Sequence, residues 1–152
     1  MIRRLLSVLL VALISGGVLA HAELRTSEPA AGAVAETAPE EVVLTFSEPL
    51  ETLFSVFKVY ELDVTDVDLT AADAEQRLNG LAAALVNDVL ELRDDGDEQV
   101  AAELVSDDAT TAELSLQFPE ALADGHYVVM WRVLSIDTHV TQDFFVFSVA
   151  AE

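Results

Sequence analysis

The stretch HYVVMWRVL, residues 126–134, decides the fold class of this 152-residue chain. Valine, tyrosine and tryptophan suit the pleated surface of a sheet, so the stretch predicts a strand. Tyr127 and Trp131 stand four residues apart on one strand face, and we expect them to fill a core. Arg132 lies on the opposite face, where we expect an acidic partner. His126 opens the strand, and we interpret it as a partly exposed residue rather than a metal ligand.

Further strand patterns lie on both sides of this stretch. They cover residues 41–48, where we expect Pro49 to end the strand, and residues 54–62, 111–118 and 143–149. Several short strands with turn signals between them, in a chain of single-domain length, indicate an all-β sandwich.

The middle of the chain, residues 63–108, is acidic and follows a different spacing. An apolar face at Leu78, Leu81, Leu85, Val89 and Leu92 predicts one inserted helix over residues 71–92. The acidic run at residues 94–97 lacks the terminal glutamate and the ligand spacing of an EF-hand, so we expect a solvated turn. The sequence suggests no function for this insertion.

The N-terminus has the features of a secretory signal peptide. Two arginines precede an apolar run over residues 5–14, and Val18-Leu19-Ala20 forms a cleavage pattern. The run is too short for a membrane span of about 20 residues. Cleavage after Ala20 makes His21 the first mature residue, although cleavage after Ala22 also fits. We therefore expect a signal peptide at residues 1–20, a domain at residues 21–152, and a periplasmic or extracellular location; the twin-arginine and general export routes remain open.

The charge of the chain excludes nucleic-acid binding. Its net charge is −21, and removal of Arg3 and Arg4 with the signal leaves −23. Phosphate backbones require lysine and arginine instead. The acidic surface could serve solubility in a salty environment or attract cations. The chain has no cysteine, which excludes thiolate metal sites. We expect a monomer.

Three residues could together bind a metal ion. A mature N-terminal His21 offers its α-amine and its imidazole, and Asp137 and His139 form an Asp-x-His pair. In an extended chain, residues two apart point to the same side, about 6.5–7 Å apart at the backbone. Three nitrogens and one oxygen in a tetragonal array suit one copper(II) ion, the strongest binder of the divalent series. Zinc accepts similar donors but prefers a tetrahedron.

Three separated motifs resemble those of the CopC-type periplasmic copper-binding proteins. They are HAELRTSEP at residues 21–29, LTFSEPL at residues 44–50, and the stretch from Gly125 to His139 that contains W-R-x-x-S-x-D-x-H. The resemblance implies an Ig-like Greek-key β-sandwich or barrel that binds copper(II) through His21, Asp137 and His139. It also implies a nearby Glu48 that orients the ligands, and a role as a carrier or buffer in copper homeostasis or resistance. An inner-membrane copper transporter of the CopD type is the implied partner.

The chain departs from that family's pattern in its centre and after the site histidine. Val140, Thr141 and Gln142 follow His139, where many members have proline and a small residue. Only Met1 and Met130 are present, so a methionine copper(I) site is not expected. No nucleophile–base pair or phosphate loop indicates an enzyme. The alternatives are a histidine-brace copper oxygenase and a structural β-sandwich that binds other proteins without a metal.

Overall fold

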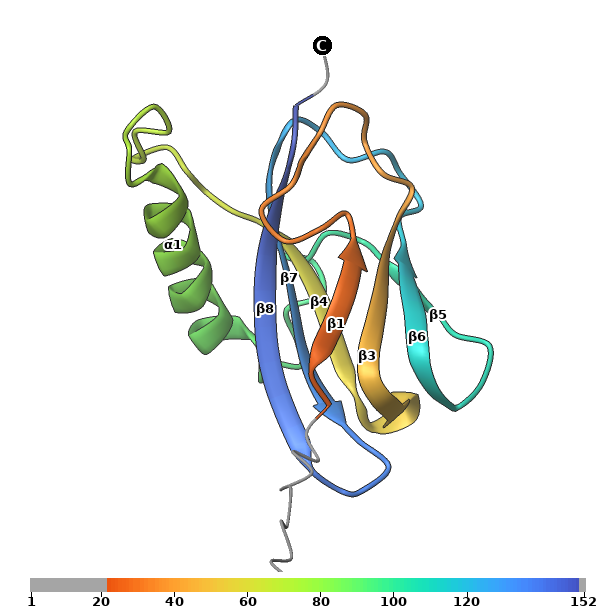
Figure 1. The fold of residues 1–152 in the computed structure, drawn as a ribbon. Helices are drawn as coiled ribbons and strands as arrows, with labels where there is room; N and C mark the ends of the chain where they lie inside the picture. Colours follow the sequence, from red (N-terminus) through yellow and green to blue (C-terminus); the bar gives the residue numbers. More distant parts are fainter. Residues whose placement is uncertain (1–21, 151–152) are drawn as a thin grey trace, which may run out of the picture.

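The computed structural model describes residues 22–150, which form two four-stranded sheets packed face to face (Figure 1). One sheet has the strand order β1-β3-β6-β5 and the other the order β2-β8-β7-β4. All neighbouring strands are antiparallel except β2 and β8, which are parallel. The elements are β1 (Leu24–Glu28), β2 (Val34–Ala35), β3 (Glu41–Glu51), the 3-10 turn η1 (Thr52–Phe54), β4 (Val56–Glu61), α1 (Ala74–Val89), β5 (Glu103–Val105), β6 (Thr110–Gln117), β7 (Gly125–Leu134) and β8 (Val140–Val149). The expected β-sandwich with one inserted helix is therefore confirmed.

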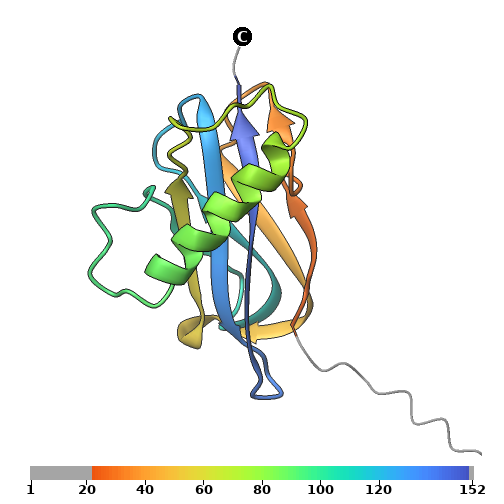
Figure 2. The same ribbon diagram turned by 90° about the vertical axis from the view of Figure 1, so that its left-hand side faces the viewer.

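Both faces of β7 are buried, which explains its nearly continuous apolar sequence. Tyr127 and Trp131 point into the core between the sheets, as expected. Trp131 packs edge-on against Phe46 of the opposite sheet, with ring centroids 5.7 Å apart. Val128 and Met130 point to the other face, where α1 covers them. Figure 2 shows α1 lying obliquely across this outer face of the β7–β8 sheet.

The helix is shorter than the spacing predicted and turns a different stripe toward the sheet. Its most buried side chains are Ala82, Val86 and Val89, with Leu78 and Leu85 partly buried beside them. The expectation was wrong for Leu81, which is 38% exposed, and for Leu92, which follows the helix and is 46% exposed. Ala82 is fully buried in the cluster between helix and sheet, so the face that carries it, rather than the leucine face, lies against the sheet.

The turn after the helix is not simply solvated, because Asp95 is buried. Its Oδ2 lies 2.6 Å from Lys58 Nζ, and the Tyr60 hydroxyl donates to the same oxygen at 2.5 Å. Lys58 also donates to the carbonyls of Val89 and Leu92 at 2.6 and 2.9 Å, which are acceptors at the end of α1. Burial raises the pKa of Asp95, but the bonds from Lys58 and Tyr60 outweigh it and lower that pKa to about 2. The cluster attaches the insertion to β4.

Strand β3 continues past Pro49, where we expected it to end. The register between β3 and β6 breaks between Thr45 and Leu50, so Pro49 lies in an irregular part of the ladder, where its missing N–H does little harm. This continuation brings β3 to the β7–β8 turn, because the Ile136 N–H donates to the Pro49 carbonyl at 3.2 Å. No helix within residues 22–150 has the length and apolar character needed to cross a membrane.

Candidate metal centre

The Asp137–His139 pair lies in the turn that joins β7 to β8, at the lower end of the sandwich in Figure 1. The expectation of an extended chain here was wrong. The Thr138 N–H donates to the Ser135 carbonyl at 2.9 Å, and the Ser135 N–H donates to the His139 carbonyl at 3.0 Å. Thr138 has a φ of 74°, in the left-handed region that few β-branched residues adopt. This closed turn, rather than strand alternation, brings the two side chains together.

The carboxylate of Asp137 organises the turn. Oδ2 lies 2.9 Å from Nδ1 of His139. Oδ1 accepts the Ser135 hydroxyl in a short hydrogen bond and the His139 N–H at 3.1 Å. The Ser135 bond lowers the pKa of Asp137 most strongly, and the bonds and charge of His139 lower it further. The carboxylate is therefore ionised at neutral pH and available to a cation.

Ser135 is the residue that fixes this arrangement, and it is only 1% exposed. Its backbone pairs with Leu50 of β3 in an isolated bridge. The spacing of residues around Ser135 in the sequence does not reveal that this side chain is buried. The only sequence signal for Ser135 was its place in the W-R-x-x-S-x-D-x-H stretch.

The start of the described chain is attached beside the same turn. The Thr141 hydroxyl donates to the Ala22 carbonyl at 2.9 Å. Glu23 and Ser47 exchange two bonds: the Glu23 N–H donates to the Ser47 hydroxyl at 3.0 Å, and the Ser47 N–H donates to the Glu23 carbonyl at 2.8 Å. Ala22 is only 3% exposed and belongs to the core between the sheets. No sequence signal predicted the anchoring roles of Ser47 and Thr141.

Glu48 follows Ser47 on β3 and carries an unusual feature. Its Oε1 is buried and has no hydrogen-bond partner among the residues that the structure describes. A buried acceptor without a donor is costly, so such an atom calls for a specific donor or cation. Glu48 stands in the chain between Ser47, which holds the N-terminal segment, and Pro49, which holds the β7–β8 turn.

His21 lies outside the described residues, and so does the signal peptide expected at residues 1–20. Within residues 22–150, no three histidine, aspartate or glutamate side chains come close enough to hold a metal ion. The described part of the chain thus brings together Asp137 and His139 only.

His126 does not belong to this end of the molecule. It lies at the opposite end of β7 from the Asp137 turn, and its Nδ1 is 2.7 Å from the Ser148 hydroxyl of β8. The side chain is partly buried, as expected. The prediction of an acidic partner for Arg132 was wrong, since no described carboxylate lies within ion-pair distance of its guanidinium.

Comparison with known proteins identifies a domain family and gives the same fold. The model of the CopC domain matches residues 24–109 and 79–150. Protein YobA of Escherichia coli K12 is 28% identical over 148 residues, covering 97% of this chain and 94% of its own. PcoC, a methionine-rich copper resistance protein from Escherichia coli, superposes with a TM-score of 0.58 at 26% identity over 86% of this chain and 100% of its own. CopC from Methylosinus trichosporium OB3b has the same fold, with a TM-score of 0.58 at 22% identity over 87% of this chain and 96% of its own.

Proposed function

Because this chain belongs to the CopC domain family, we propose that its mature form is an exported protein that binds one copper(II) ion. It acts in copper homeostasis or resistance as a carrier or buffer rather than as an enzyme. Residues 1–20 are removed as a signal peptide, and residues 21–152 form a periplasmic, monomeric copper-binding domain with the acidic insertion at residues 63–108. The copper ligands are the amine and imidazole of His21, the carboxylate of Asp137 and the imidazole of His139.

The anchoring of Ala22 is the observation that carries this proposal. Ala22 is hydrogen-bonded to Thr141, two residues after His139. His21 is joined to Ala22 by one peptide bond, so cleavage after Ala20 would leave the new amine and imidazole one residue from this anchored carbonyl. Cleavage after Ala22 would remove both groups.

The separation of the two turn donors is compatible with a shared metal ion, and their chemical types favour copper. Two ligands at about 2.0 Å from a metal, at a right angle to one another, lie about 2.8 Å apart. Asp137 Oδ2 and His139 Nδ1 are 2.9 Å apart, so they have the spacing of neighbouring ligands once a metal replaces the shared proton. An ionised carboxylate and nitrogen donors favour copper(II) over the other divalent ions of its series.

The proposed N-terminal amine would supply a hydrogen-bond donor to the buried Oε1 of Glu48. A mature N-terminal amine bonded to copper still carries N–H groups, and Glu48 Oε1 is a buried acceptor without a described donor. We assign Glu48 to orient that amine rather than to bind the metal. Such outer contacts typically change metal affinity by about tenfold to a hundredfold.

The test is a copper(II) titration of two proteins that differ only at the N-terminus. One begins at His21 and the other has one additional glycine before it. The first should give a d–d absorption band that saturates near one equivalent, and the second should bind orders of magnitude more weakly. Equal binding would remove the amine from the site, and no band in either protein would contradict copper(II) binding altogether.

Two variants complete the design. His139→Ala should weaken binding, whereas His126→Ala should leave it unchanged, because His126 lies at the opposite end of β7. Rapid hydrogen peroxide production by the copper-loaded protein with a reductant would instead favour the oxygenase alternative. The CopD-type transporter remains the proposed partner, and it can be tested by copper transfer between the purified proteins.

A further inference from the structure

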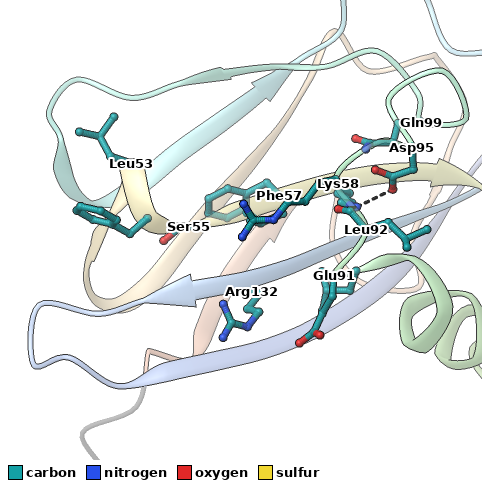
Figure 3. Close-up of a pocket in the computed structure, with 13 residues that line it drawn as sticks. Leu53, Ser55, Phe57, Lys58, Glu91, Leu92, Asp95, Gln99 and Arg132 are labelled. Carbon is teal, nitrogen blue, oxygen red and sulfur yellow. Dashed lines mark hydrogen bonds and ion pairs between the residues drawn. The ribbon is translucent and has the colours of Figure 1, made fainter.

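A groove of about 770 Å³ lies along β4, beside the segment that follows α1 (Figure 3). Residues from η1 and the first half of β4 line it, together with residues 90–93 and Asp95 after the helix. Arg132 of β7 reaches it from the neighbouring strand. The copper proposal assigns no role to this groove.

The groove collects positive charge on a strongly acidic protein. Of the five lysines and arginines that follow the signal, three line it: Lys58, Arg93 and Arg132. Lys58 is neutralised by buried Asp95. Arg93 and Arg132 are exposed, and no described carboxylate lies within ion-pair distance of either. The chain has 28 acidic residues, so a shortage of carboxylates does not explain why these two guanidinium groups have no ion-pair partner within residues 22–150.

Exposed apolar side chains line the same groove as the two arginines. Leu53 is 81% exposed, Phe54 69% and Leu92 46%. Aromatic residues and arginine are enriched at protein interfaces, where they often carry much of the binding energy. The carboxylates of the lining are Glu91 and the Lys58-bound Asp95, so the groove still presents more positive than negative charge.

The edge of β4 beside the groove offers backbone hydrogen bonds. β4 is the last strand of its sheet. The Leu62 N–H donates to the His126 carbonyl on the β7 side, whereas the Val59 carbonyl accepts the Val100 N–H on the outer side. Backbone groups alternate along an antiparallel strand, so the N–H and carbonyl of Phe57 also face outward. Across this outer edge, neither group forms a backbone hydrogen bond with another described residue.

We propose that this groove and the edge of β4 bind an extended acidic segment of a partner protein by strand addition. The segment pairs with the backbone of Phe57, and its carboxylates pair with Arg93 and Arg132. Its apolar side chains cover Leu53 and Phe54. The net negative charge of the rest of the protein does not prevent this contact, because salt of about 0.15 M screens repulsion beyond about 8 Å.

The test uses a synthetic peptide of about eight residues, the length of a long strand, with alternating glutamate and valine and blocked ends. It is titrated into ¹⁵N-labelled protein in about 0.15 M salt and followed by NMR. We expect shifts at residues 56–58 and 92–95, together with slower hydrogen exchange of the Phe57 amide. A peptide with lysine in place of glutamate is the matched control and should not bind.

Substitutions separate the groove from general electrostatics. Arg93→Gln and Arg132→Gln should each weaken binding of the acidic peptide by about tenfold. Arg25→Gln removes an exposed arginine of β1, in the other sheet, and should have no effect. The fluorescence of Trp131 confirms that each variant is folded.

Four results would overturn the proposal: no binding of the acidic peptide, equal binding of the lysine peptide, an equal effect of Arg25→Gln, or binding without protection of the Phe57 amide. Binding of phosphatidylglycerol vesicles in place of the peptide would also overturn it, since the anion would then be a lipid. None of these outcomes depends on copper binding, so they test the groove separately from the proposed function.

Discussion

The buried ion pair between Lys58 and Asp95 should contribute strongly to stability, and Lys58→Met tests this. Both side chains are only 4% exposed, and Nζ lies 2.6 Å from Oδ2. The substitution leaves the Asp95 carboxylate buried with Tyr60 as its remaining side-chain donor. It also removes the donor from the carbonyls of Val89 and Leu92. Breaking such a pair from one side costs about 3–5 kcal/mol.

The chain contains a matched control in Arg77→Met. Arg77 and Asp73 form an ion pair of similar length, 2.9 Å, but their side chains are 55% and 51% exposed. Exposed pairs four residues apart on a helix contribute about 0.3–0.5 kcal/mol. The two variants therefore compare the same kind of interaction in buried and exposed surroundings.

Urea unfolding measures the difference through the fluorescence of Trp131, the one tryptophan of the chain, which is 2% exposed. Domains of this kind have total free energies of unfolding of about 5–15 kcal/mol, so Lys58→Met should shift the midpoint far more than Arg77→Met. Equal shifts would refute the reasoning. The double variant Lys58→Met/Asp95→Leu should lose less than the sum of the two single variants, because it leaves no uncompensated charge.

Three further predictions concern pH and the metal turn. The folded pKa of Asp95 is about 2, below its unfolded value, so its stabilising contribution is complete above about pH 4 and is lost as the pH falls toward 2. The difference in unfolding free energy between the parent and Asp95→Asn should therefore narrow over that range. A constant difference would contradict the assignment. Copper(II) affinity should fall as the pH drops from about 8 through 6.5 and below, because protons compete for the amine and imidazole nitrogens. A titration series with constant affinity down to about pH 5 would exclude those ligands. Ser135→Ala removes the hydroxyl that holds Asp137 and should weaken copper(II) binding by about tenfold or more, whereas an unchanged affinity would show that the turn needs no such support.

Local patterns were sufficient for the strands and for the main core. The β-rich stretch at residues 126–134 forms β7, and Tyr127 and Trp131 point inward because residues four apart share a strand face. The family motifs identified the pair Asp137–His139 and Ser135 beside it. Their spacing favours an extended chain, since nothing in the five residues 135–139 reveals a left-handed Thr138.

Residues distant in sequence set the remaining features. The helix lies on the sheet along Ala82 and Val86, a stripe that its leucine spacing did not predict, because which face is buried depends on packing against distant strands. Lys58 and Asp95 are 37 positions apart, and each alone has the pattern of a solvated charge. The anchoring of Ala22 by Thr141 spans 119 positions.

The sequence by itself determined the sandwich, its principal strands and the chemical types of the proposed copper ligands, because alternation and motif spacing are properties of neighbouring residues. Only the tertiary structure decided which polar groups are buried together. Burial depends on what the rest of the chain places against a residue, and no local period carries that information. The attachment of the helical insertion to β4, the unpartnered oxygen of Glu48 and the arginine-lined groove beside β4 all follow from such distant contacts.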